Sequence, residues 1–382
     1  MQSLLSQDDR YLFNDGSQLH LHRKLGAHPI ESGSGWSVPF AGWTPTAARL
    51  CAIGDLDDRA SDKHRLAPVG GSGICAGSVA GARVGDLYKF HIEPAGGDPF
   101  LDPDLDPDLE KADPFAVPAH AEPPPRTASR LCALDRAWQD DVGMAGRRDR
   151  TRPASPTSID AVHLRAWRRA PESGGFLDDR ALAHALAETA RDMGCADMGC
   201  TPAEPMPVME HPFYYGYCGS FYYGAYCGAW GDQTRHDLAP TAPYGAPQDL
   251  TFRIDGLHRS GIGVILDRAP SHRPDDPPDD PRQDSHSDCG RRPFDDGRPD
   301  VRRFPLSSAF HGIETGHVDA LRVDAVASKL PIDCGRAGGE GAPNARGGRI
   351  ESRPSDRPGR PDSLERRRPP QAVVVRGRER RP

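Results

Sequence analysis

The sequence predicts a multidomain protein of class β plus α/β, in which an N-terminal β-sandwich is followed by an incomplete (β/α)8 barrel, or TIM barrel. Short apolar runs separated by Gly-rich turns occupy residues 1–150, and this pattern is typical of a small sandwich. From Ser158 onward, strand-like and helix-like segments alternate. That βαβα order favours a parallel sheet with right-handed crossovers.

The predicted sandwich covers residues 1–150. Its clearest strands are residues 48–53 and 86–92, which are apolar runs set between Gly-rich turns. Runs of this length bounded by turn residues are typical of strands rather than helices. We therefore expect a β-rich module at the start of the chain.

The α/β part is predicted to cover residues 155–350 and to open with a strand at residues 159–164. A helix follows a candidate cap at Asp178, and a second strand then leads into residues 209–211. The apolar residues of that helix recur at helical spacing; they are Leu182, Leu186, Ala190 and Met193. Pro202 and Pro205 fall in the second strand, where each removes a hydrogen-bond donor from the sheet.

Two further helix–strand pairs complete the predicted elements. One helix begins near Pro247, closes at Gly261 and leads into a strand at residues 262–267. The other closes at Gly316 and leads into a strand that ends at Asp324; its apolar residues are Leu306, Phe310 and Ile313.

The α/β part has only four predicted strands, whereas a complete barrel has eight strands and about 250 residues. We therefore expect the first half of a barrel, in a truncated chain. Residues 351–382 are rich in Arg and Pro and are predicted to form a disordered tail.

The overall composition excludes several classes of partner. A net charge of −7 favours neither nucleic acid nor a membrane surface, and no apolar stretch is long enough to span a bilayer. Residues 1–9 lack the basic and apolar regions of an export signal. We therefore expect a cytoplasmic protein with no membrane or nucleic-acid partner.

The sequence predicts no metal site and no cofactor. The nine cysteines form no C-x-x-C pair, so neither a disulfide framework nor a zinc site is indicated. The acidic, Pro-rich residues 274–288 do not match the spacing of a calcium loop and are predicted to be a solvated linker.

Two predicted strands of the α/β part end in a carboxylate, Asp267 and Asp324. Residues at the C-terminal ends of barrel strands face the active site, so both carboxylates are predicted to share a pocket. Arg322 lies two residues before Asp324, and such residues face the same side of a strand. A guanidinium beside Asp324 keeps that carboxylate ionised, as a covalent nucleophile must be.

Seven short segments, in order along residues 11–350, carry a family resemblance. They resemble segments of the 1,4-α-glucan (glycogen) branching enzymes, which belong to the α-amylase-like superfamily. The segments are residues 25–29 (LGAHP), 87–90 (LYKF), 111–115 (KADPF), 162–169 (VHLRAWRR), 207–213 (PVMEHPF), 261–267 (GIGVILD) and 320–328 (ALRVDAVAS).

The resemblance implies a site that acts on α-glucans during glycogen biosynthesis. Branching enzymes cleave α-1,4 linkages and form α-1,6 linkages by a retaining mechanism that uses two carboxyl groups. By position in the motifs, Asp324 matches the nucleophile and Arg322 its charge partner, while Asp267 and His272 match the pair that shapes the sugar site.

The resemblance also implies a glucan-binding module at residues 1–150. The face of an exposed tryptophan is the usual sugar platform of such modules, and Cys75 stands where a tryptophan is expected. The alternative interpretation of the module is a structural spacer.

The general acid expected by the resemblance is missing from the sequence. In the family it is a glutamate on the fifth strand, but none of the glutamates after Asp324 follows a strand-like run; they are Glu340, Glu351, Glu365 and Glu379. Without this acid the chain is expected to be catalytically impaired. Two alternatives stay open: a non-catalytic glucan-binding protein, and a decayed reading frame that folds poorly, which the low apolar content of 36% favours.

Overall fold

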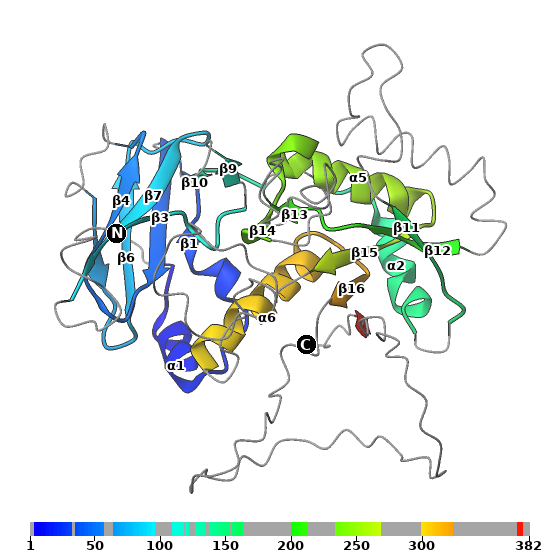
Figure 1. Ribbon diagram of the computed structural model, residues 1–382, viewed down its shortest axis with the longest axis horizontal. Helices are drawn as coiled ribbons and strands as arrows, with labels where there is room; N and C mark the ends of the chain where they lie inside the picture. Colours follow the sequence, from blue (N-terminus) through cyan, green and yellow to red (C-terminus); the bar gives the residue numbers. More distant parts are fainter. Residues whose placement is uncertain are drawn as a thin grey trace, which may run out of the picture.

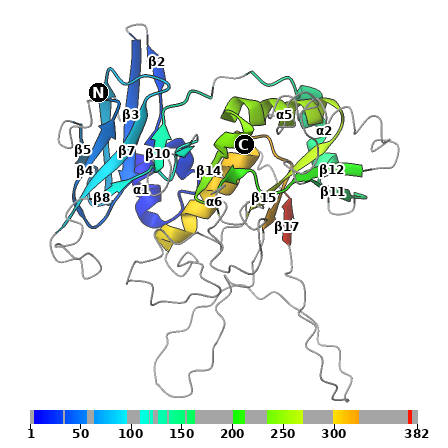
Figure 2. The same cartoon turned by 45° about the horizontal axis from the view of Figure 1, so that its top comes forward.

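The structure is a computed structural model with two parts that lie side by side (Figures 1 and 2). One part is rich in antiparallel strands, and the other combines a parallel sheet with helices. The described residues are 4–32, 35–56, 64–95, 109–117, 119–121, 127–134, 137–152, 155–162, 200–211, 234–268, 299–323 and 373–376.

The N-terminal part is built on a ten-stranded antiparallel sheet with the order β1-β3-β6-β5-β4-β7-β10-β9, in which β2 also pairs with β3 and β8 with β7. The predicted strands at residues 48–53 and 86–92 correspond to β4 and β7, which pair with each other. The strands are β1 (Gly26–Ala27), β2 (Ile30–Ser32), β3 (Gly35–Trp43), β4 (Ala47–Gly54), β5 (Arg65–Pro68), β6 (Ile74–Ala80), β7 (Leu87–Pro94), β8 (Leu109–Lys111), β9 (Ala119–Ala121) and β10 (Thr127–Arg130).

Alternating side chains of the long strands form the core of this sheet. Val38 and Phe40 are two residues apart on β3, as are Tyr88 and Phe90 on β7, and all four are buried in one cluster. Alternation of this kind places every second residue on the same face of a strand. The sheet therefore curls around an apolar interior, which confirms a β domain at this end of the chain.

A short helix and a helical turn lie against this sheet. Helix α1 (Gln7–Asp15) begins with a capping box, since Ser6 Oγ accepts from Asp9 N at 3.0 Å and Asp9 Oδ2 accepts from Ser6 N at 2.9 Å. It ends at Gly16, where φ is 85°. The 3-10 turn η1 (Leu21–Arg23) follows. Both pack through a second core cluster: Leu5, Phe13, Leu21, Leu25, Ala41 and Ile74.

The second sheet confirms the predicted parallel arrangement. Strands β11, β12, β15 and β16 are parallel and adjacent in chain order, and β17 joins β16 in the antiparallel direction. Strand β17 was not predicted; it lies within residues 351–382, where the structure describes residues 373–376. The strands are β11 (Ser158–Val162), β12 (Cys200–Pro205), β15 (Gly263–Arg268), β16 (Ala320–Val323) and β17 (Val373–Arg376).

The second predicted strand differs from the structure at its end. Strand β12 stops at Pro205, and β13 (Met209–Glu210) pairs instead with β14 (His236–Pro240) in a separate two-stranded antiparallel sheet. Prolines 205 and 207 provide no N–H for the parallel ladder, which explains why the strand ends there. The helix predicted after Asp178 lies outside the described residues.

Three helices cover the described part of this sheet: α2 (Asp141–Arg150), α5 (Pro247–Arg259) and α6 (Pro299–Glu314). Helices α5 and α6 confirm the two helix–strand pairs that the sequence predicts. Helix α2 lies within residues 1–150, yet it packs on α5 and β15, so we describe it with the α/β part. Within the described ranges, no helix is long and apolar enough to cross a membrane.

Local chemistry explains where α5 begins and ends. Pro247 occupies its first turn, and the Asp249 carboxylate accepts from the backbone N–H of Ala246 at 2.9 Å. Gly261, with φ of 77°, supplies the left-handed residue that turns the chain into β15. The apolar face of α5 packs on the sheet through Ile254 and Leu257.

We predict that Gly54→Ala destabilises the N-terminal sheet by about 2–4 kcal/mol. Gly54 has φ of 145°, and a Cβ there would lie 2.8 Å from Tyr88 Cα and would also clash with the carbonyl of Leu87. Urea unfolding measures the change. The control is Gly71→Ala, since a Cβ at Gly71 meets no atom within 4 Å; equal losses for both variants would contradict the steric explanation.

Candidate functional site

Three neighbouring parallel strands bring a cation and two carboxylates together. Arg322 on β16 is the direct cross-strand partner of Asp267 on β15, and its Nη1 donates to Asp267 Oδ2. The Nε atom of Arg322 also lies 3.6 Å from Oε1 of Glu204 on β12. Asp267 is fully buried, whereas the Arg322 side chain is 26% exposed. The carboxylate of Asp267 is therefore inaccessible to solvent, and Arg322 is the partly exposed member of this pair.

The alternation of β15 separates this cluster from the helices. Arg268, the next residue, points toward α6, where its Nη1 donates to the carbonyl of Pro305 at 3.3 Å. Leu266 packs on the same side, in the core cluster that includes α5. Because successive side chains face opposite sides of a strand, Asp267 faces away from the helices. In a barrel, that side is the interior.

Glu204 is the residue of this cluster that sequence reasoning missed. Its strand contains Pro202 and Pro205, which hide the usual strand pattern, although a charged residue among apolar neighbours was a usable signal. Burial raises the pKa of the Glu204 carboxyl, and the positive charge of Arg322 acts in the opposite direction.

The structure places only part of the predicted site. It brings Asp267 and Arg322 together, while Asp324 and His272 lie outside the described residues. Arg322 was predicted to stand beside Asp324; among described groups it contacts Asp267 and Glu204. Asp324 directly follows Val323, the last residue of β16.

A second polar cluster lies at the opposite end of the same strands. His258 of α5 contacts Asp140 Oδ2 through Nδ1 at 2.7 Å and Asp319 Oδ2 through Nε2 at 2.9 Å. Asp319 Oδ2 also accepts from the backbone N–H of Val264 at 2.7 Å. Burial lowers the pKa of His258, but the hydrogen bonds and charges of Asp319 and Asp140 outweigh it and raise that pKa. This cluster fixes where β15 and β16 begin.

The buried Glu210 of β13 is a third perturbed group. Its Oε2 accepts from the backbone N–H of Ala242 at 3.0 Å, which ties β13 to η3 (Ala242–Tyr244). Burial raises the pKa of Glu210 to about 7, against the hydrogen bonds from Ala242 and Thr241. The residue supports the chain between β12 and α5 and lies within the segment PVMEHPF.

These features define a class of protein: an α-amylase-like fold with a charged cluster on neighbouring strands. The structure is similar to a putative alpha amylase from Salmonella typhimurium, with a TM-score of 0.56 and 20% identity over 81% of this chain and 45% of that one. It is also similar to the apo pullulanase from Paenibacillus barengoltzii, with a TM-score of 0.55 and 17% identity over 84% of this chain and 50% of that one. At these identities the likeness shows the fold alone.

The sequence identifies the particular relatives. It is 40% identical to the 1,4-alpha-glucan branching enzyme GlgB of Albidiferax ferrireducens over 90% of this chain and 52% of that protein. It is 41% identical to GlgB of Aromatoleum aromaticum over 91% and 51%, and 39% identical to GlgB of Aquifex aeolicus over 91% and 52%. The chain is thus a homologue of the branching enzymes and spans about half the length of these curated relatives. No family model matches it.

We predict that Arg322→Gln destabilises the protein by about 2–3 kcal/mol, because it leaves the buried Asp267 carboxylate without this cation. In an Asp267→Asn background the same change should cost less, since one of the two carboxylates is then neutral. Urea unfolding of the four proteins of this double-mutant cycle measures the coupling. Arg148→Gln, on the exposed face of α2, is the control; additive losses in the cycle would contradict the pairing.

We also predict that the native protein loses stability as pH rises from about 4.5 to 7 and that Glu210→Gln abolishes this loss. The folded pKa of Glu210 is raised, so its stabilising contribution is present below the ordinary pKa and is lost as pH rises through about 7. The difference at pH 8 is on the order of 3 kcal/mol in favour of the variant. Unfolding measured across pH, with the exposed Glu31→Gln as control, tests this; parallel pH curves for native and Glu210→Gln proteins would contradict it.

Proposed function

We propose that this chain carries the sugar-binding half of a branching-enzyme active site and acts on α-glucans. The observation that carries the proposal is the Arg322–Asp267 pair, which joins two adjacent parallel strands in a chain about 40% identical to branching enzymes. The parallel sheet is then the first half of a (β/α)8 barrel, and the antiparallel part is a sandwich-type module. The pullulanase of Paenibacillus barengoltzii, which has a similar fold, binds maltohexaose and alpha-cyclodextrin.

Each site residue has a role in this proposal. Asp324 is the nucleophile that attacks the anomeric carbon, because it follows β16 and belongs to the segment ALRVDAVAS. The fixed guanidinium of Arg322 favours the ionised form of neighbouring carboxylates. Asp267 and His272 are the pair that shapes the site of the same glucose unit. Asp267 is fully buried and contributes by holding the partly exposed Arg322 in place.

The reaction needs a second carboxyl group as well. A general acid must protonate the leaving oxygen and then deprotonate the incoming 6-hydroxyl of the acceptor glucan. No glutamate after Asp324 stands in a strand-like context within these 382 residues. We therefore infer that this chain by itself binds α-glucan but does not transfer glucan chains. This is the alternative of a non-catalytic glucan-binding protein, with the glucan bound at the branching-enzyme site.

We predict that glycogen retards the 382-residue chain in native gels and that Asp267→Asn weakens this binding at least about tenfold. The neutral amide no longer attracts the guanidinium of Arg322, the partly exposed group of the cluster, and tenfold in binding corresponds to about 1.4 kcal/mol. Asp8→Asn, on the exposed face of α1, should leave the retardation unchanged. A native chain that melts cooperatively and is not retarded by glycogen would overturn the proposed function.

We further predict that the purified chain forms no branch points on amylose, measured by debranching and chain-length analysis. Asp324→Asn should give the same null result as the native chain. Branch formation by the native chain, abolished by Asp324→Asn, would confirm the nucleophile and refute the inference about the missing acid.

A further inference from the structure

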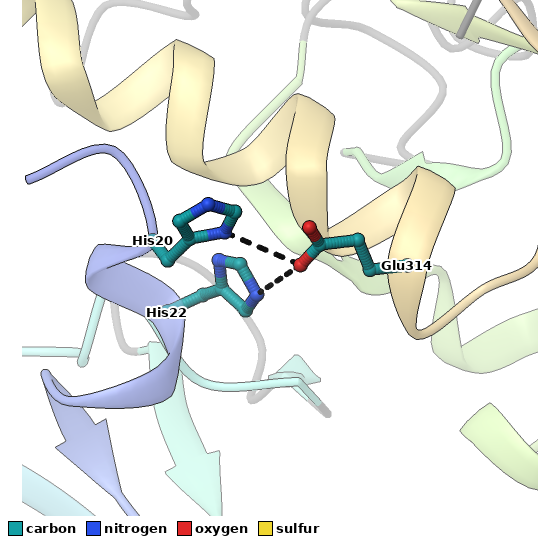
Figure 3. Close-up of side chains that lie close together, drawn as sticks. All are labelled: His20, His22 and Glu314. Atoms are coloured by element: carbon teal, nitrogen blue, oxygen red, sulfur yellow. Dashed lines mark ion pairs between the residues drawn. The ribbon is translucent and has the colours of Figure 1, made fainter. Parts of the chain in front are cut away.

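Three side chains with metal-binding atoms converge where the N-terminal part meets α6. Figure 3 shows His20 and His22, from the segment around η1, pointing toward Glu314 at the end of α6. His20 Nδ1 lies 3.2 Å and His22 Nε2 lies 3.9 Å from Glu314 Oε2. The three donor atoms lie within 4.8 Å of one another. None of these three residues belongs to either polar cluster of the parallel sheet.

We propose that His20, His22 and Glu314 form a binding site for a divalent transition metal, with Zn²⁺ as the best match. Two imidazole nitrogens and one carboxylate oxygen are a common donor set for zinc. Zinc–ligand bonds of about 2.0–2.1 Å in a tetrahedron separate neighbouring donors by about 3.3 Å. The His20–Glu314 separation already fits, and the His22–Glu314 separation of 3.9 Å exceeds that value by about half an ångström. Water completes the fourth position.

The burial of His22 is the second observation that points to a ligand. Its side chain is 3% exposed, and its Nε2 has no hydrogen-bond partner within the described part of the chain. The other ring nitrogen, Nδ1, lies 3.1 Å from Ser307 Oγ of α6, and the backbone N–H of His22 donates to the same oxygen at 2.8 Å. Ser307 therefore orients the ring, as second-shell hydrogen bonds do for metal-binding histidines. A buried nitrogen without a partner is costly, and a metal bond would satisfy it.

Solvent reaches the cluster from its other side. The side chains of His20 and Glu314 are 36% and 31% exposed. Arg23 Nη2 lies 2.7 Å from Glu314 Oε2, but the Arg23 side chain is 57% exposed. Exposed ion pairs of this kind contribute about 0–1 kcal/mol. A dication can therefore replace Arg23 as the counter-ion of Glu314 at small cost.

Metal binding at this place links two elements that are distant in sequence. Residues 20 and 22 flank and enter η1, while Glu314 is the last residue of α6, whose other end contacts α1 through Arg303 and Phe13. A ligand that binds the folded protein and not the unfolded chain stabilises the fold by mass action. Zinc should therefore raise the melting temperature of the whole chain.

The test titrates ZnCl2 into the chelator-treated 382-residue chain by calorimetry and compares three exposed variants. His20→Gln and Glu314→Gln should each weaken one zinc site at least about tenfold, while Arg23→Gln should tighten it by up to about fivefold because the competing cation is gone. His22 is left unchanged because its burial makes a variant prone to misfolding. The opposite sign for Arg23→Gln distinguishes metal binding from a general loss of stability.

The visible spectrum of the Co²⁺-loaded chain identifies the ligand atoms. Histidine and carboxylate ligands give d–d bands without the intense near-ultraviolet absorption of thiolate ligands, which matters because the chain has nine cysteines. Thiolate absorption that persists in His20→Gln, or zinc affinity unchanged in both His20→Gln and Glu314→Gln, would overturn the proposal.

Discussion

The buried pair of Arg322 and Asp267 is the interaction on which the arrangement of the parallel sheet depends. Asp267 is fully buried and Glu204 nearly so. Arg322 of β16 contacts Asp267 on the adjacent strand β15 and Glu204 on the next strand, β12. Two buried carboxylates on one face of a sheet repel each other and lose hydration, and the positive charge of Arg322 offsets part of that cost.

The polar residues at the two ends of β15 and β16 differ in their hydrogen bonding and exposure. At the start of β15 and β16, the Asp319 carboxylate contacts His258 Nε2 and accepts a hydrogen bond from the backbone N–H of Val264. Both ring nitrogens of His258 have a carboxylate partner, so this histidine has no ring nitrogen left to bind a ligand. At the other end, Arg322 is partly exposed and Asp324 follows directly. In α/β barrels the C-terminal strand ends carry the chemistry and the opposite ends carry stability, and this asymmetry agrees with that rule.

The sequence predicted those elements whose signals are local. Helices α5 and α6 and the strands after them follow from apolar spacing and from the glycines at 261 and 316. The end of β12 was missed because prolines obscure the strand pattern, and Glu204 was missed with it. The His20–Glu314 contact could not be predicted, since it joins residues from opposite ends of the described chain and depends on how α6 docks. Contacts that form only after docking leave no periodic signal in the sequence.

Helix α6 contacts both parts of the molecule. Near its start, Arg303 donates to the carbonyl of Phe13 and lies over its ring; in its middle, the carbonyl of Pro305 accepts from Arg268; at its end, Glu314 faces η1. Arg268 is the neighbour of Asp267 on β15, so a shift of α6 is transmitted to the strand that carries Asp267. The contacts of α6 with η1 at one end and with Arg268 in its middle therefore connect the N-terminal part to the strand that carries Asp267.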